Sequence, residues 1–190
     1  ALRAANANVK LNIGEIIHEG KNIAAFDGNV ALNDGNLNIS PMRLQYAKNL
    51  FTGNIGIDGR DATPTLTVNL NSDKLDYGAL LKELKLNDRI SGTGALALAL
   101  SGSGKDLRAA MGNSRGNFKL TSNEGEFATG ILFDGVGNVL RLALPGYSVP
   151  NVAHLRCANF TFTGQNGVWQ TTNSAADSDV LALQMSGEVN

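Results

Sequence analysis

Residues that build catalytic and metal sites are scarce in this sequence. Its 190 residues include one cysteine and two histidines. A single cysteine excludes an intrachain disulfide, and neither His18 nor His154 has a partner at metal-ligand spacing. We therefore expect no cofactor, no metal and no enzymatic activity, because a nucleophile, a base and an orienting group cannot be assembled. Cys157 alternates with Leu155 and is predicted to be a small buried hydrophobic residue.

Charge of one sign and long apolar runs are also lacking. The net charge is −1, from 16 basic and 17 acidic residues. Without a basic stripe, nucleic acid is not an expected partner. No run approaches the roughly 20 apolar residues of a membrane-spanning helix, and the N-terminus does not resemble a signal peptide. Because the chain starts and stops inside strand-like alternation, we interpret it as a piece of a longer protein.

Glycine and alternating apolar residues are abundant instead. The chain has 22 glycines and 43% hydrophobic residues, but only 6% aromatic residues. This composition favours many turns joined by slim aliphatic strands. The segment Asn33-Asp34-Gly35-Asn36 predicts a type I′ hairpin turn, and Asn166-Gly167 predicts another turn. The sequence therefore predicts a mainly β fold, an extended and curled antiparallel sheet of repeated hairpins.

Two or three short helices are expected to interrupt the strands. Ser72-Asp73 is suited to cap a helix over Leu75 to Leu84. Ser103 is suited to cap a shorter helix over Lys105 to Met111. A third candidate spans Thr129 to Leu142, although its three interior glycines each cost about 1 kcal/mol relative to alanine.

Three glycine motifs resemble catalytic or nucleotide-binding signatures, but their context disfavours that function. Gly112-Asn113-Ser114-Arg115-Gly116 matches a nucleophile elbow, yet the predicted order here is helix then strand rather than strand then helix. Gly102-Ser103-Gly104-Lys105 lacks the first glycine of a phosphate-binding loop, and Asp106 replaces its metal-binding hydroxyl. Gly92-Thr93-Gly94 is followed by a strand pattern instead of the helix that a dinucleotide requires. We interpret all three as structural glycines.

Three longer segments carry a family resemblance. They read MRLQYAKNLFTGNIGIDGRDATPTLTVNLNSDKLDYGALL (42–81), ISGTGALALALSGSGKDLRAAMGNSRGNFKLTSNEGEF (90–127) and LRCANFTFTGQNGVWQTTNSAADSDVLALQMSGEVN (155–190). Their series of glycine-bounded strands, Asp-Gly and Asn-Gly turns and a Leu-Asp-x-Gly-x-Leu-Leu segment resembles the C-terminal repeat region of AsmA-family proteins. The similarity rests on the order of several weak signatures from about Val9 to the end.

The resemblance implies a domain organisation, a location and partners. Residues 1–190 would form a single AsmA-like C-terminal β-repeat domain, a fragment of a longer membrane-anchored protein. That protein would be attached to the bacterial inner membrane by an N-terminal helix absent from this sequence, with its β-repeats in the periplasm. It would act in outer-membrane biogenesis, with phospholipid or another membrane lipid, and other envelope proteins, as partners.

Eight apolar residues are candidates for a lipid-binding groove, because strand alternation places them on one face. They are Leu66, Val68, Leu70, Leu96, Leu98, Leu100, Phe118 and Leu120. The same residues would also fit a closed core under the short helices. The competing function is a structural scaffold or assembly factor that affects outer-membrane protein insertion without carrying lipid, and the sequence leaves both open.

Overall fold

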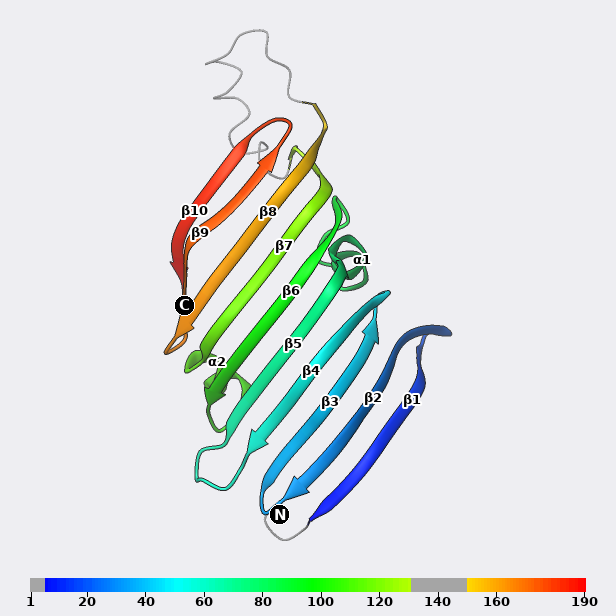
Figure 1. Ribbon diagram of the computed structural model, residues 1–190, viewed down its shortest axis with the longest axis vertical. Helices are drawn as coiled ribbons and strands as arrows, with labels where there is room; N and C mark the ends of the chain where they lie inside the picture. The colour runs from blue at the N-terminus through cyan, green and yellow to red at the C-terminus, as the bar shows by residue number, and fades with distance from the viewer. Residues whose placement is uncertain (1–5, 131–149) are drawn as a thin grey trace.

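A single open antiparallel sheet dominates the computed structural model, which describes residues 6–130 and 150–190 (Figure 1). The strands lie in the sheet in chain order, β1 to β10, so consecutive strands pair and the sheet does not close. The predicted mainly β, curled antiparallel fold is thereby confirmed. The strands are β1 (Ala7–His18), β2 (Lys21–Asn33), β3 (Asn36–Tyr46), β4 (Asn49–Asp58), β5 (Thr65–Asp76), β6 (Ile90–Ser103), β7 (Arg115–Ala128), β8 (Val152–Gln165), β9 (Val168–Ser178) and β10 (Ala182–Val189).

Tight turns make this order possible. Asp34 and Gly35 join β2 to β3 with φ of 45° and 80°, and Asn166 and Gly167 join β8 to β9 with φ of 51° and 80°. Positive φ at both central positions is the geometry of a type I′ turn, whose twist matches that of the flanking strands. Both turns predicted from the sequence are confirmed.

Helix α1 (Tyr77–Glu83) is shorter than the predicted helix over Leu75 to Leu84. Asp76 is its N-cap, and the carboxylate accepts a hydrogen bond of 2.8 Å from the amide of Ala79. The predicted cap, Ser72-Asp73, is wrong because the chain is still part of β5 at those positions. Strand pairing with β6 continues as far as Asp76, so the helix begins only after it.

Helix α2 (Leu107–Gly112) occupies most of the segment predicted from Lys105 to Met111. Its N-cap is Asp106, which accepts a hydrogen bond from Ala109, and not Ser103 as predicted. Ser103 is the last residue of β6, and its backbone is held by the sheet. Of the third predicted helix, Thr129 to Leu142, residues 131–142 lie outside the described residues.

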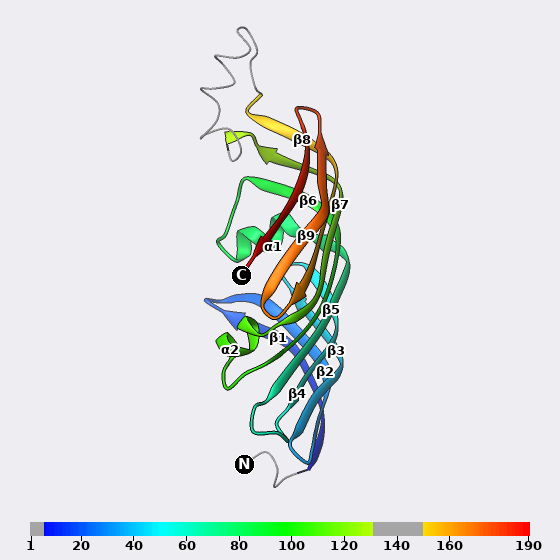
Figure 2. The same cartoon turned by 90° about the vertical axis from the view of Figure 1, so that its left-hand side faces the viewer.

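The sheet has two chemically different faces, and both helices lie on its concave side (Figure 2). Residues paired directly across antiparallel strands point to the same face. The side chains on the concave face are mostly apolar. One row crosses six strands and consists of Val9, Val30, Ile39, Ile55, Val68 and Leu100. The opposite face carries small and polar residues, including Asn69, Asn71, Ala97, Ala99, Asn117 and Lys119.

The buried core is small and lies where α1 covers the sheet. Phe51, Leu75 and Tyr77 form its centre. Half-buried side chains pack around them, namely Leu44, Tyr46, Leu80, Ile90, Leu96 and Leu120. Because the centre joins β4, β5 and α1, it fixes the helix against the concave face.

A buried side-chain amide beside this core connects the β3–β4 turn to the start of α1. Asn49 is 0% exposed, and its Oδ1 accepts a hydrogen bond of 2.6 Å from the amide of Asp76. Its Nδ2 donates to the carbonyls of Asp76 at 3.1 Å and Ala47 at 2.9 Å. The side chain thus ties the β3–β4 turn to the residue that caps α1.

We expect Asn49→Ala to destabilise the protein by about 2–3 kcal/mol, because it leaves buried backbone groups without partners. The control is Asn38→Ala, at an exposed position on the polar face, where we expect a change within about 0.5 kcal/mol. Chemical denaturation of the three proteins measures the difference. Equal unfolding midpoints for both variants would contradict the structural role of Asn49.

Candidate functional site

The eight candidate residues lie together on the concave face. Leu66, Val68 and Leu70 belong to β5, and Leu96, Leu98 and Leu100 belong to β6. The remaining two are Phe118 and Leu120 in β7. Cross-strand pairing joins them into a patch through the pairs Val68–Leu100, Leu70–Leu98, Leu98–Phe118 and Leu96–Leu120, with Leu66 paired to Gly102.

The patch continues into β8 through two aromatic residues that were not among the candidates. Phe162 is opposite Phe118, and Phe160 is opposite Leu120. The rings of Phe118 and Phe162 are 6.0 Å apart between centroids and tilted by 58°. This is a favourable aromatic arrangement. The alternation of β8 was visible in the sequence, but its register with β7 was not.

A cavity of about 490 Å³ lies in the patch, between α1 and the sheet. Leu80 and Leu81 of α1 form one wall. Of the eight candidates, three line the cavity and five lie on the face outside it. The sheet residues that line it are Leu75, Ile90, Leu96, Phe118, Leu120, Ser122, Glu126, Phe127, Leu155, Phe160, Ala176, Ser178 and Leu183, with Leu181 between β9 and β10.

Tyr77 fixes α1 over this cavity. Its hydroxyl lies 2.9 Å from the hydroxyl of Ser122 and donates a hydrogen bond of 3.2 Å to the carbonyl of Glu124. Gly92 and Gly125 make room for the phenol, since a Cβ at either position would collide with the Tyr77 hydroxyl. Burial raises the pKa of Tyr77, so the phenol stays protonated at neutral pH and donates to the carbonyl of Glu124.

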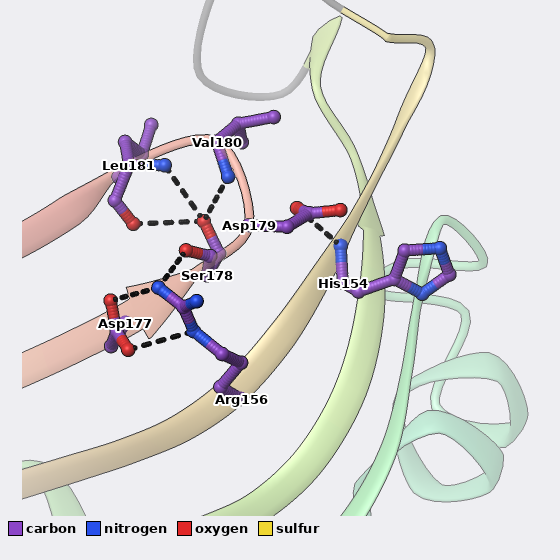
Figure 3. A network of polar contacts seen from close by, with 7 residues as sticks. All are labelled: His154, Arg156, Asp177, Ser178, Asp179, Val180 and Leu181. Atoms are coloured by element: carbon purple, nitrogen blue, oxygen red, sulfur yellow. Dashed lines mark hydrogen bonds and ion pairs between the residues drawn. The ribbon is translucent and has the colours of Figure 1, made fainter.

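The far wall of the cavity is held by polar contacts at one end of β8 and β9 (Figure 3). Arg156 makes two hydrogen bonds of 2.9 Å to the carboxylate of Asp177 and one of 2.7 Å to the carbonyl of Ser178. The pairing with Asp177 raises the pKa of Arg156 above its ordinary value. The Ser178 hydroxyl donates to the carbonyl of Leu181 and accepts from its amide. These contacts position Leu181 at the cavity.

An exposed pair lies nearby. The imidazole Nδ1 of His154 is 3.3 Å from a carboxylate oxygen of Glu126, and both side chains are more than half exposed. The amide of His154 donates to the carboxylate of Asp179. Such an exposed pair contributes little to stability, and Glu126 is one of the residues that line the cavity.

Comparison with known proteins decides the family. The sequence pattern described as the AsmA family matches residues 1–184. The chain belongs to the AsmA family. It is similar to the AsmA family protein YhjG of Escherichia coli (strain K12), with 24% identity over 179 residues, 92% of this chain and 26% of the relative. The chain thus spans about a quarter of that relative's length, and no solved structure matches it significantly.

Two general statements follow from membership of the AsmA family. AsmA family proteins are associated with the cell envelope, and the family is not a known enzyme family. Among the described residues, no helix is long and apolar enough to span a membrane. Within the same ranges, no three His, Cys, Asp or Glu residues are grouped closely enough to hold a metal ion.

The glycine motifs of this AsmA chain are structural, as the sequence indicated. Ser114, the serine of the apparent nucleophile elbow, follows α2 and is 0% exposed. Its hydroxyl accepts a hydrogen bond of 3.1 Å from the indole nitrogen of Trp169. Gly102 and Gly104 lie directly beneath α2, where a Cβ would collide with helix backbone. Gly92 and Gly94 lie within β6.

The prediction that Cys157 is buried is wrong. Its side chain is exposed, whereas Leu155 lines the cavity. The two residues do not share a face because the register with β9 shifts between them. A shift of this kind reverses the alternation locally, and it leaves no periodicity signal in the sequence.

We expect Tyr77→Phe to destabilise the protein by about 1 kcal/mol, because it removes the hydroxyl that bonds Ser122 and Glu124. Tyr46→Phe is a matched control: Tyr46 packs against the same core, and within the described residues its hydroxyl makes no hydrogen bond. Thermal unfolding measured by circular dichroism distinguishes the two. A Tyr77→Phe midpoint as high as that of Tyr46→Phe would mean that the hydroxyl does not fix α1.

Proposed function

We propose that this chain is a non-catalytic, lipid-binding part of a protein of bacterial outer-membrane biogenesis, and that it binds lipid tails on its concave face during phospholipid transport between membranes. The observation that carries the proposal is the continuous apolar patch formed by the eight candidate residues. It lies on an open sheet that curves around it.

The exposure of the patch favours a groove over a closed core. Of the eight side chains, only Leu100 is buried, and the other seven are half-buried. A core that served stability alone would bury them, because each Å² of apolar surface withdrawn from water stabilises by about 25 cal/mol. Large exposed apolar patches on soluble domains mark interaction sites.

The chemistry of the patch suits a ligand that moves. Extracting a lipid of about 30 methylenes from a bilayer into water costs on the order of 24 kcal/mol, at about 0.8 kcal/mol for each methylene. An apolar groove of similar area offsets most of that cost. All eight side chains are aliphatic or aromatic hydrocarbons without charge, so they offer no strong anchor that would trap a lipid.

The location and partners belong to the same proposal. An envelope-associated family supports a periplasmic position, with attachment to the inner membrane through an N-terminal helix outside this sequence. The proposed partners are phospholipid and other envelope proteins. The burial of Ser114 supports a function without catalysis, because it removes the serine that most resembles a nucleophile.

The alternative is a scaffold or assembly factor that carries no lipid. It is favoured by the two outer strands, because β1 and β10 each pair on one side only in the described sheet. Unpaired strand edges are templates for pairing with another chain. Val9, Leu11, Ile13 and Leu183 are exposed apolar residues on these strands.

Leu98→Glu is expected to abolish co-purification of lipid, because it places a charge in the middle of the patch. Ala97→Glu is the matched control: it is the neighbouring residue, is exposed and lies on the polar face, so lipid should remain bound. Native mass spectrometry, with lipid extraction in parallel, measures the bound phospholipid.

Two results would reject the lipid function. One is a folded wild-type protein that carries no lipid and binds none from phospholipid vesicles. The other is equal lipid binding by the Leu98→Glu and Ala97→Glu variants. Either result would favour the scaffold alternative.

A further inference from the structure

Helix α2 buries an alanine and exposes its two largest apolar side chains. Ala110 is 5% exposed, whereas Leu107 is 67% exposed and Met111 is 44% exposed. No larger side chain fits on the inner side, because Gly102 and Gly104 let the helix backbone approach so closely that a Cβ on either would collide with it. A helix that served only to cover the sheet would bury its leucine and its methionine. The outer face of α2 therefore offers apolar side chains to a partner.

Two other projecting segments expose apolar side chains in the same way. At the end of α1, Leu84 is 46% exposed and Leu86 is 69% exposed. Beside the β1–β2 turn, Ile17 is 64% exposed. Among the described residues, Ile17, Leu86 and Leu107 are three of the four most exposed large apolar side chains. Each of the three segments thus has one aliphatic side chain that the fold leaves in water.

We refer to these segments, residues 16–21, 82–89 and 105–111, as the tips. All three project on the concave side of the sheet (Figure 2). They are not in line, because the β1–β2 turn and α1 lie at one end of the strands and α2 lies at the other end of β6 (Figure 1). The 14 residues of β6 span about 46 Å, at about 3.3 Å for each residue. Three separated points that face the same side suit a flat partner.

The tips are more basic than the rest of the chain. They carry six basic and four acidic side chains, compared with 16 and 17 in the whole chain. All six basic side chains are exposed, and one acidic side chain caps α2 through its hydrogen bond to Ala109. The basic residues are Lys21, Lys82, Lys85, Arg89, Lys105 and Arg108, and the acidic residues are Glu19, Glu83, Asp88 and Asp106. The exposed aliphatic side chains therefore lie among a net positive charge, which complements an anionic surface.

A lipid bilayer fits the tips better than a protein partner does. A stable protein interface buries about 800 Å² on each partner in one patch. Each tip offers one or two exposed apolar side chains, and α1 and α2 are separated by the length of a strand. A bilayer is flat over that distance and accepts each side chain separately at the boundary between headgroups and acyl chains. The neighbouring lysines and arginines then lie at the level of the phosphates.

We propose that the three tips dock the chain on an anionic phospholipid bilayer, with Ile17, Leu86 and Leu107 inserted at the headgroup boundary. The concave face then opens toward the membrane. This docking surface is separate from the eight residues of the apolar patch, and it does not require lipid in the patch. A docked chain holds the patch next to the bilayer, so the proposed lipid-binding function would gain a source of lipid.

Vesicle flotation tests the docking surface with the purified chain. One probe is vesicles of phosphatidylcholine and phosphatidylglycerol at about three to one, and the other is vesicles of phosphatidylcholine alone. We expect binding to the anionic vesicles that is about tenfold stronger than to the neutral ones and that weakens in about 0.5 M salt, because the tips are net positive. A wild-type protein that binds neither vesicle, or both equally, would overturn docking on an anionic bilayer.

Substitutions at the tips locate the contact. Leu86→Glu and Leu107→Glu should each weaken vesicle binding about tenfold, because a charged side chain no longer inserts. Leu50→Glu is the matched control with the same change of charge: Leu50 is 46% exposed and faces away from its neighbour Phe51 of the concave core, so binding should stay within twofold. Circular dichroism verifies that all three variants fold. Equal vesicle binding by the tip variants and Leu50→Glu would overturn the assignment to the tips.

An environment-sensitive fluorophore measures insertion directly. The chain has a single cysteine, Cys157, whose exposed side chain does not share the face of the cavity residue Leu155. A label on Leu86→Cys, in a Cys157→Ser background, should at least double its emission on anionic vesicles. The same label on the native Cys157 should keep its emission. Unchanged emission at position 86, or an equal increase at both positions, would contradict insertion of the tip.

The docking surface and the lipid-binding function fail separately. If the wild type carries phospholipid but floats with neither vesicle, the tips do not dock and the proposed function stands. If the wild type floats with anionic vesicles, loses this binding in the tip variants and carries no lipid, the docking surface stands and the lipid-binding function fails.

Discussion

Cross-strand register is the constraint on which this structure depends. Side chains alternate between faces along a strand, so a shift of one residue in any pair would move apolar side chains to the polar face. The row from Val9 through Ile39 to Leu100 crosses six strands without such a mismatch. Each connection in this part of the sheet therefore keeps the apolar side chains on the concave face. This holds for the long connection between β4 and β5 and for the one between β5 and β6, which contains α1.

The second requirement is that an open apolar sheet remain folded without a large core. Few side chains are fully buried, and several of those are polar. Asn49 and Tyr77 show how polar groups assist, because each forms hydrogen bonds between segments far apart in the chain. The backbone ladders hold the sheet, and these side chains fix α1 to it. The concave face can then stay partly exposed.

Local signals in the sequence predicted the elements well, because hairpins depend on neighbouring residues. Asp34-Gly35 and Asn166-Gly167 formed the predicted turns, and alternation placed Leu96, Leu98 and Leu100 on one face. Pairing between strands decided the rest. It extended β5 to Asp76 beyond the expected helix start, and a register shift exposed Cys157. No short-range pattern encodes either event.

Only part of the candidate site was predicted from the sequence, because the rest depends on how distant strands pair. The eight residues on β5, β6 and β7 lie together, but the cavity also uses Leu155, Phe160 and Leu181 from the last third of the chain. Their contribution depends on how β8 and the β9–β10 turn curve toward α1, and the polar contacts of Arg156 and Ser178 set that geometry. The sequence shows these residues as apolar but does not show which distant helix they approach.

Site-specific photocrosslinking in living cells tests the central claim, that the concave face binds lipid tails. A photoreactive amino acid would replace Phe118, whose side chain lies beside Leu98 on the concave face, or Lys119, its neighbour on the polar face. Irradiation followed by mass spectrometry identifies the adducts. The account predicts phospholipid adducts at position 118 and none at position 119. Equal labelling at both positions, or protein adducts alone at position 118, would contradict it.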